Sequence, residues 1–176
     1  MADMDLFRKE YLSFKSTFKE TSYDSDNSVY LCSDETQEVI GFDKIIENMY
    51  PDSNNRPKSF DAIYFYDDNI YCIEFKNQKK PDKKDIEEKL LDGKKELIKL
   101  MNTLHIPSKK YKFVFCLVYN KHIPKEERFK RGLYKSISFE FLNKYKQEGF
   151  VKDIFTENVN FYTKQFKKLT TKELAC

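Results

Sequence analysis

Two apolar runs separated by a short polar turn constrain the fold more than any other stretch of this chain. Residues 60–66 read FDAIYFY, residues 70–76 read IYCIEFK, and the turn between them is Asp67-Asp68-Asn69. Aromatic and β-branched residues on both sides of an Asp/Asn turn predict a β-hairpin. Because both faces of these strands are largely apolar, we expect them to be central strands of a sheet that is covered on both sides.

Three charged residues in this hairpin are predicted to share one face. Residues two apart on a strand point the same way, so Glu74 and Lys76 lie on one face. With a loop at residues 67–68, Asp61 lies opposite Glu74, and with a loop at residues 68–69 it lies opposite Lys76. A three-residue loop would break the cluster unless a bulge restored the phase. The two faces expected from this alternation are Ile63, Phe65, Ile70 and Cys72 with the charged residues, and Phe60, Tyr64, Tyr71, Ile73 and Phe75 opposite them.

Two acids and a lysine are costly to bury without a partner, which indicates a site. A divalent cation relieves the repulsion between Asp61 and Glu74, and their hard oxygen ligands suit Mg²⁺ or Mn²⁺. Protonated Lys76 orients a water or stabilises a negatively charged oxygen. This combination is suited to phosphodiester hydrolysis. The alternative is a buried Asp–Lys–Glu ion-pair network without a metal, which gives little net stability.

Asp61 followed by Glu74-x-Lys76 at the end of an apolar strand resembles the PD-(D/E)xK nuclease superfamily, which includes many restriction endonucleases, Holliday-junction resolvases and repair nucleases. The resemblance implies an αβββαβ core, with Asp61 and Glu74 binding Mg²⁺ and Lys76 assisting the attacking water. It also implies that the backbone carbonyl of Phe75 completes the metal shell. One departure is that Phe60, not proline, precedes Asp61.

The same resemblance implies one more acid from the first core helix. The spacing of Val39, Phe42 and Ile46 predicts a helix over residues 35–50. Glu38 is our candidate for the fourth catalytic residue and Glu35 is the reserve, because both flank or lie on the apolar stripe. The alternative for either residue is a solvated helix acid.

Lysines follow directly on the Glu-x-Lys strand end. Lys79, Lys80, Lys83 and Lys84 would ring the rim of the site, and Gln78 would touch phosphate or water if the strand continues. A second basic run lies between residues 121 and 131. Such rims neutralise phosphates and make binding salt-dependent. The alternative is a solvated, lysine-rich surface.

Composition excludes several classes of protein. The net charge of +3 is too small by itself to indicate a nucleic-acid binder. Four widely spaced cysteines without a CxxC pair predict reduced, packed thiols rather than a zinc site or a disulfide framework. No signal peptide and no stretch of about 20 apolar residues is found, so we expect a soluble cytoplasmic protein without membrane contact.

The remaining pattern predicts one α/β domain over residues 1–176, with an αβββαβ core, a central mixed sheet flanked by helices, and extra N- and C-terminal helices. We expect a helix over residues 3–21, a short strand at 29–32, a helix from about 82 to 105, a buried strand at 111–119, and helices near 137–147 and 157–168. The expected subdivision is an N-terminal helix and loop (1–28), the core (29–120) and a C-terminal helical extension (121–176).

Together these observations favour a Mg²⁺- or Mn²⁺-dependent nuclease, with DNA expected before RNA as its substrate. One such site cuts one strand, so a homodimer with two sites is compatible with this activity. Two alternatives stay open: a catalytically inactive nucleic-acid-binding module of a larger complex, and a protein-interaction factor that docks through its N-terminal helix.

Overall fold

The computed structural model describes residues 2–77, 82–119 and 139–176 of the chain. Its α-helices are α1 (Ala2–Glu10), α2 (Phe18–Thr21), α3 (Phe42–Met49), α4 (Lys83–Thr103), α6 (Asn143–Gln147) and α7 (Val159–Thr170). Short 3-10 turns lie at Leu12–Phe14, Ser108–Lys110 and Glu140–Leu142. Within the described residues, every helix falls short of the length and apolarity that a membrane crossing requires.

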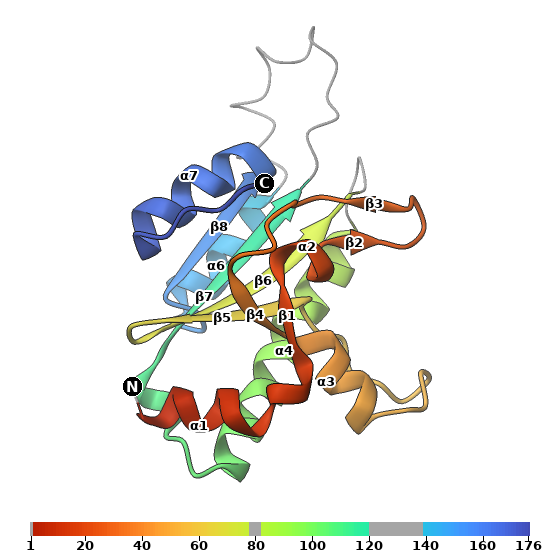
Figure 1. Ribbon diagram of the computed structural model, residues 1–176. Coiled ribbons are helices and arrows are strands. Elements are labelled where there is room, and N and C mark those ends of the chain that lie inside the picture. The colour runs from red at the N-terminus through yellow and green to blue at the C-terminus, as the bar shows by residue number, and fades with distance from the viewer. Residues whose placement is uncertain (1, 78–81, 120–138) are drawn as a thin grey trace, which may run out of the picture.

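A mixed six-stranded sheet forms the centre of the α/β fold, as the sequence predicts (Figure 1). The spatial order is β1-β4-β5-β6-β7-β8; β1, β4, β5 and β6 pair antiparallel, whereas β6, β7 and β8 pair parallel. Helix α4 makes the crossover from β6 to β7, because parallel strands need such a connection. These strands are β1 (Lys15–Thr17), β4 (Glu38–Gly41), β5 (Ala62–Tyr66), β6 (Asn69–Lys76), β7 (Lys112–Tyr119) and β8 (Asp153–Asn158).

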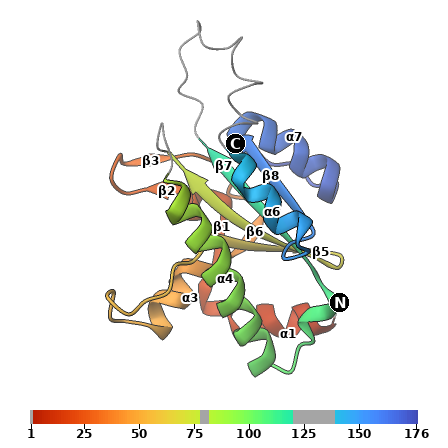
Figure 2. The ribbon, with the colours of Figure 1, turned by 180° about the vertical axis from the view of Figure 1, so that it is seen from behind.

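A separate two-stranded sheet lies beside the main one. Strands β2 (Tyr23–Asp24) and β3 (Val29–Tyr30) form a small antiparallel hairpin. In both views this hairpin projects next to the carboxyl end of β6 (Figures 1 and 2). The expected strand at residues 29–32 is therefore present in shortened form, but it stands outside the main sheet.

The β5–β6 hairpin adopts the first of the two registers that bring the charged residues together. Tyr66 pairs with Asn69 across an Asp67-Asp68 loop, and the ladder runs to Ala62 opposite Ile73. Asp67 takes a positive φ of 50°, a conformation that Asp tolerates better than most residues. Since side chains alternate along each strand, this register fixes which residues share a face.

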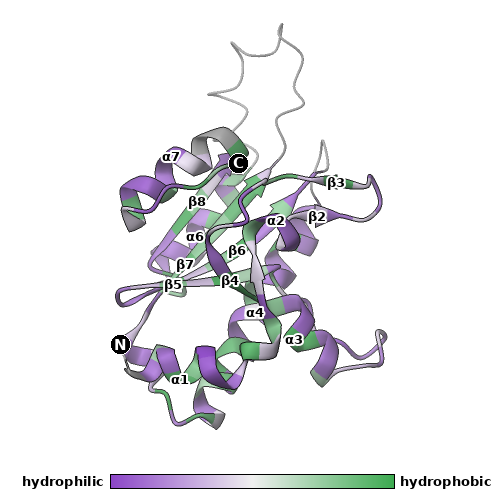
Figure 3. Ribbon diagram, viewed as in Figure 1, coloured by the Kyte–Doolittle hydropathy of each residue, from purple (hydrophilic) through white to green (hydrophobic). Residues whose placement is uncertain are grey.

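Each face of the sheet has its own hydrophobic cluster, as expected for strands covered on both sides. Helices α1, α3, α4 and α6 cover one face and α2 and α7 cover the other (Figures 1 and 2). Apolar residues gather on the strands while polar ones dominate the outer helix surfaces (Figure 3). The predicted alternation is confirmed except at Phe60, which packs in the same cluster as Ile63 because it precedes β5.

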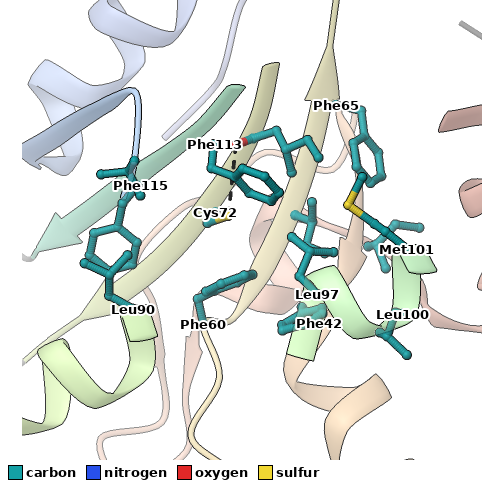
Figure 4. Packing of buried hydrophobic residues seen from close by; sticks show 14 of the residues in the cluster. Phe42, Phe60, Phe65, Cys72, Leu90, Leu97, Leu100, Met101, Phe113 and Phe115 are labelled. Carbon is teal, nitrogen blue, oxygen red and sulfur yellow. Dashed lines mark hydrogen bonds between the residues drawn. The ribbon is translucent and has the colours of Figure 1, made fainter. Parts of the chain in front are cut away.

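Helix α4 packs tightly against Phe60 at Gly93. A Cβ atom at this position would lie 2.6 Å from Cδ1 of Phe60. The Phe60 ring stacks in turn on Phe42 with the centroids 4.6 Å apart (Figure 4). The glycine therefore lets α4 settle onto the aromatic pair, and this contact fixes the height of the helix above the sheet.

Two expected helices are shorter in the structure. The helix expected over residues 3–21 ends at Glu10, because a capping box between Thr17 and Glu20 starts the separate helix α2. The helix expected over residues 35–50 begins only at Phe42, and residues 38–41 form strand β4 instead. Val39 pairs with Ser16 of β1, so sheet pairing overrides the helical spacing of the apolar residues.

The C-terminal part is not purely helical. Strand β8 adds to the sheet beside β7 between two helices, where the sequence analysis expects helices alone. All six residues of β8 are only partly buried, which is why their pattern lacks the continuous apolar run of β7. The predicted final helix is confirmed as α7.

The cysteine prediction is half right. Cys72 and Cys116 are buried free thiols, as expected. Cys32 and Cys176 form a disulfide across 144 residues, which corrects the expectation that all four are reduced. A nearby contact ties the same two segments together: Asp34, two residues after Cys32, accepts a 2.8 Å hydrogen bond from the backbone N–H of Ala175, the residue before Cys176.

Candidate active site

The structure brings the three predicted charged residues to one place. Asp61 precedes β5, and Glu74 and Lys76 lie at the end of β6. Nζ of Lys76 lies 2.9 Å from Oε1 of Glu74. A second ammonium joins the two acids, because Nζ of Lys89 lies 2.7 Å from the same oxygen and 3.8 Å from Oδ1 of Asp61.

Helix α4 supplies two residues that the sequence analysis misses. Lys89 bridges the acids, and Asp85, one turn earlier, lies 2.7 Å from Nζ of Lys76. Asp85 also pairs with Lys58 at 2.9 Å. Both α4 residues stand at helical spacing beside the buried Ile86, and this i, i+4 pair of charges at the edge of an apolar stripe is the signal that could have identified them.

The resulting network alternates positive and negative charges. In order along the network, it runs Lys58–Asp85–Lys76–Glu74–Lys89–Asp61. It contains three ammonium groups and three carboxylates, so its formal charge is zero when all six are ionised. The buried end is the one that holds the predicted acids, and the exposed end is at Lys58.

Glu74 is the most deeply buried member of this network. Its side chain has no solvent exposure, while those of Asp61, Lys76 and Lys89 are each less than a fifth exposed. Both ammonium groups contact Oε1 of Glu74, and the buried Oε2 has no hydrogen-bond partner among the described residues. A buried carboxylate oxygen without a partner is costly, so this atom is a free position for a cation or a water.

Asp61 is held in place by the backbone of the neighbouring strand. The N–H of Phe75 donates a 2.6 Å hydrogen bond to Oδ2 of Asp61. Burial, followed by the negative charge of Glu74, raises the pKa of Asp61 well above its ordinary value, against the opposing effect of Lys89. The two acids therefore repel each other in the structure, as the sequence analysis expects.

The lysines are firmly charged. Burial acts to lower the pKa of Lys76, but the charge of Glu74 and the hydrogen bond to Asp85 outweigh it and raise this pKa. The pKa of Lys89 is also raised, because Glu74 and Asp61 outweigh its burial. Burial acts to raise the pKa of Asp85, yet hydrogen bonds from Lys76 and Lys58 lower it to about 2.

A hollow of about 480 Å³ opens beside these residues. Asp61, Phe75 and Lys76 line one side of it. The opposite side is formed by residues 20–27 together with Leu31, which belong to α2 and the β2–β3 hairpin. Helix α3 contributes the remaining wall with its first turn.

No protein-family model, curated protein or solved structure matches this chain.

The two helix acids predicted from the sequence, Glu38 and Glu35, lie away from the hollow, whereas another acid, Asp43, lines it. Glu38 lies on β4, is exposed, and pairs with Lys15 on the edge strand; Glu35 is also exposed and pairs with Lys19. Neither lines the hollow. Asp43, in the first turn of α3, lines it with Asp61, and burial raises its pKa. The helix predicted from the sequence begins seven residues before α3 does, and this is why Asp43 is not among the predicted acids.

The predicted basic rim is described only in part. Lys83 and Lys84 are exposed at the start of α4, whose N-cap is Asp82. Nζ of Lys84 lies 3.6 Å from Glu88, and its side chain is 83% exposed. Gln78, Lys79 and Lys80 lie outside the described residues, as does the basic run between residues 121 and 131.

The donor set is compatible with a hard divalent cation, although it is small. Among the described residues, no three His, Cys, Asp or Glu side chains gather closely enough to hold a metal by themselves. Asp61 and Glu74 are nevertheless two carboxylates close to one ammonium, and Glu74 keeps one buried oxygen unpaired. Two carboxylates completed by a backbone carbonyl and waters are an ordinary Mg²⁺ environment.

Proposed function

We propose that this protein is a Mg²⁺- or Mn²⁺-dependent nuclease of the PD-(D/E)xK type that hydrolyses phosphodiester bonds, with DNA as the expected substrate. The observation that carries the proposal is the meeting of Asp61, Glu74 and Lys76 at the start of β5 and the end of β6, beside an open hollow. The antiparallel strands β4, β5 and β6, followed by helix α4 and the parallel strand β7, support the same reading, although α3 lies between β4 and β5 and β1 adds a fourth antiparallel strand.

Asp61 and Glu74 would hold the cation, with the backbone carbonyl of Phe75 as a further ligand. When bound, the cation would lower the pKa of a water and stabilise negative charge on the phosphate. Oε2 of Glu74 is the oxygen best suited to this contact, because both lysines already occupy Oε1. The hydrogen bond from Phe75 orients the Asp61 carboxylate for the same purpose.

Lys76 acts as a charged group in this proposal and not as a general base. Its raised pKa keeps the ammonium protonated at neutral pH. A protonated lysine beside Glu74 can orient the attacking water and stabilise the charge that develops on the phosphate oxygens. Asp85 holds this ammonium from the other side and is a positioning residue.

Lys89 supplies the counter-charge for Asp61 and Glu74 while no cation is bound. Cation binding and the Lys89 contacts therefore compete for the same two carboxylates. The exposed Lys83 and Lys84 would contact phosphates outside the site. A homodimer and a cytoplasmic location complete the proposal. In a reducing cytoplasm Cys32 and Cys176 would be free thiols, whereas an oxidising compartment keeps their disulfide.

Cleavage of circular DNA in Mg²⁺ or Mn²⁺, with a supercoiled plasmid tested beside a single-stranded circle of the same sequence, tests this function. Asp61→Asn, Glu74→Gln and Lys76→Ala should each reduce the rate at least a hundredfold, and chelation of the metal should abolish it. Lys95→Ala is the matched control, because Lys95 is exposed on the same helix as Lys89 but has no place in the network or the basic rim. Equal activity of wild type and Lys76→Ala would refute the assignment.

A catalytically inactive nucleic-acid-binding module is the second candidate. The observation that favours it is Lys89, which neutralises both acids from within the chain. Titration with Mn²⁺ separates the two functions. If Asp61→Asn leaves the Mn²⁺ affinity unchanged while DNA binding persists, the inactive module is the better account.

A further inference from the structure

The β2–β3 hairpin exposes an aromatic pair. Tyr23 and Tyr30 face each other in register, their ring centroids are 4.7 Å apart, and they are 47% and 49% exposed. Of the seven large hydrophobic side chains exposed in the described residues, three lie on this hairpin, the third being Val29. Such clustering is unlike the scattered apolar residues of an ordinary surface and points to a binding role.

The hairpin is fastened to the candidate active site. Nδ2 of Asn77, the residue after Lys76, donates a 2.6 Å hydrogen bond to Oδ2 of Asp24. Tyr23 and Asp24 line the same hollow as Asp61 and Lys76. Because the tie joins Asn77, directly after β6, to strand β2, the hairpin has a fixed place beside the carboxyl end of β6 (Figures 1 and 2).

The charged side chains of the site are little exposed to solvent. The side chains of Asp61 and Lys76 are less than a fifth exposed, and both line the hollow. Its volume of about 480 Å³ is typical of pockets that take a small molecule, which span roughly 300–1,000 Å³. A group the size of one nucleotide fits this volume, whereas a stretch of base-paired duplex is larger than the hollow.

The wall of the hollow is rich in hydrogen-bond acceptors. Asp24, Asp26 and Asp43 all line it, with Lys44 as a nearby cation. Carboxylates repel a phosphate but accept hydrogen bonds from the amino groups of bases. Those amino groups are free on the pairing edge of a base only when the strand is unpaired. This acidic part of the wall thus suits a base, while the proposed function places the phosphate at Asp61 and Lys76 in the same hollow.

From these observations we infer that the substrate is single-stranded nucleic acid, or an unpaired strand joined to a duplex, and that Tyr23 and Tyr30 stack on its bases. The inference deepens the proposed nuclease function and rests on it for the position of the scissile phosphate. Nζ of Lys19, which pairs with Glu35, lies 5.4 Å from the centre of the Tyr30 ring and would lie near the backbone of a stacked strand. Stacking on aromatic rings tolerates any sequence, so base-specific recognition is not expected of this pair.

Binding measured in the absence of cleavage tests the inference. The probe is a dye-labelled 20-nucleotide single strand of mixed sequence, followed by fluorescence anisotropy in EDTA, beside its fully paired duplex. Wild type should bind the single strand at least tenfold more tightly. Changing both tyrosines to alanine (Y23A with Y30A) should weaken this binding about 5-fold to 150-fold, as the loss of a stacked base predicts.

The matched control keeps the rings: Y23F with Y30F should retain the affinity within about twofold. Equal affinity of wild type for single strand and duplex, or an unchanged affinity of the alanine variant, would overturn the inference. So would absent binding of the single strand, which would leave the hairpin to a protein partner. Cleavage is scored separately, because a protein that binds single strands but cuts nothing refutes the nuclease proposal and leaves this inference standing.

Discussion

The ammonium of Lys89 lies 2.7 Å from Oε1 of Glu74, deep under the first turns of α4. This contact joins a helix residue to the central strand and brings Asp61 within 3.8 Å of the same nitrogen. It makes the candidate site electrically neutral in the absence of a metal. A bound cation must therefore compete with Lys89 for the same two carboxylates.

Removing the Lys89 ammonium should destabilise the protein and favour metal binding. Lys89→Met keeps the length of the side chain but leaves two acids without their shared partner, and breaking a buried ion pair costs roughly 3–5 kcal/mol. Added Mn²⁺ at a hundred times its Kd should restore about 2.7 kcal/mol. Thermal unfolding with and without MnCl₂ measures both effects. Lys84→Met is the control, and equal Mn²⁺ responses in the two variants would contradict the account.

Ionisation of Asp61 should lower the free energy of unfolding at neutral pH. Its folded-state pKa is raised, so the folded protein binds this proton more tightly than the unfolded chain does. The corresponding stability is present below the unfolded pKa of about 3.9 and is lost as the pH rises through the folded value. In Asp61→Asn the side chain does not ionise, so this loss of stability with rising pH is absent. The amide oxygen can still accept the hydrogen bond from the N–H of Phe75.

Asp61→Asn should therefore be more stable than wild type at pH 8, and the difference should shrink toward pH 4. Urea unfolding across this range measures it. Mn²⁺ at pH 8 should narrow the difference by stabilising wild type alone. A difference that stays constant with pH and metal would show that the carboxylate has no such cost.

Gly93→Ala should destabilise the fold although alanine is the better helix former. The new Cβ would lie 2.6 Å from the Phe60 ring, and overpacking of this kind costs about 1–3 kcal/mol against about 1 kcal/mol gained in helix propensity. Lys95→Ala, at an exposed position two residues later on α4, should be nearly neutral. Equal unfolding free energies for the two variants would show that α4 can move away from Phe60 without loss.

Loss of the disulfide should release the C-terminal tail. Cys176→Ser opens a loop of 144 residues, and chain entropy sets its stabilisation at roughly 5 kcal/mol at most. The variant should unfold at lower temperature, as should reduced wild type. In native reduced protein only Cys32 and Cys176 should become reactive, because burial raises the thiol pKa of Cys72 and Cys116. Two reactive thiols in native, unreduced protein would contradict the pairing.

The sequence predicts the hairpin and its charged face because both depend on local rules. An Asp67-Asp68 loop and strict alternation place Asp61 and Glu74 together without knowledge of the rest of the fold. Local rules do not predict the strand at residues 38–41. The spacing of Val39 and Phe42 suits a helix, and only the pairing of residues 38–41 with β1 and β5, which are distant in sequence, makes them a strand.

The partners of the site could not be predicted from sequence for a related reason. Lys89 and Asp85 reach Glu74 and Lys76 only because α4 packs on the sheet in one rotation, which Gly93 and Phe60 determine. Asp43 reaches the hollow only because α3 begins late. The Cys32–Cys176 bond has no motif in the chain. Such relationships are tertiary, and local patterns do not encode them.

The central claim is that Asp61 and Glu74 bind one divalent cation. Crystals soaked in MnCl₂ and measured at the manganese absorption edge test it most directly. The account predicts one anomalous peak within about 2.5 Å of a carboxylate oxygen of each residue, with Lys89 displaced from Asp61, and no peak in Asp61→Asn. An empty position in wild type, with Lys89 still bridging both acids, would contradict it.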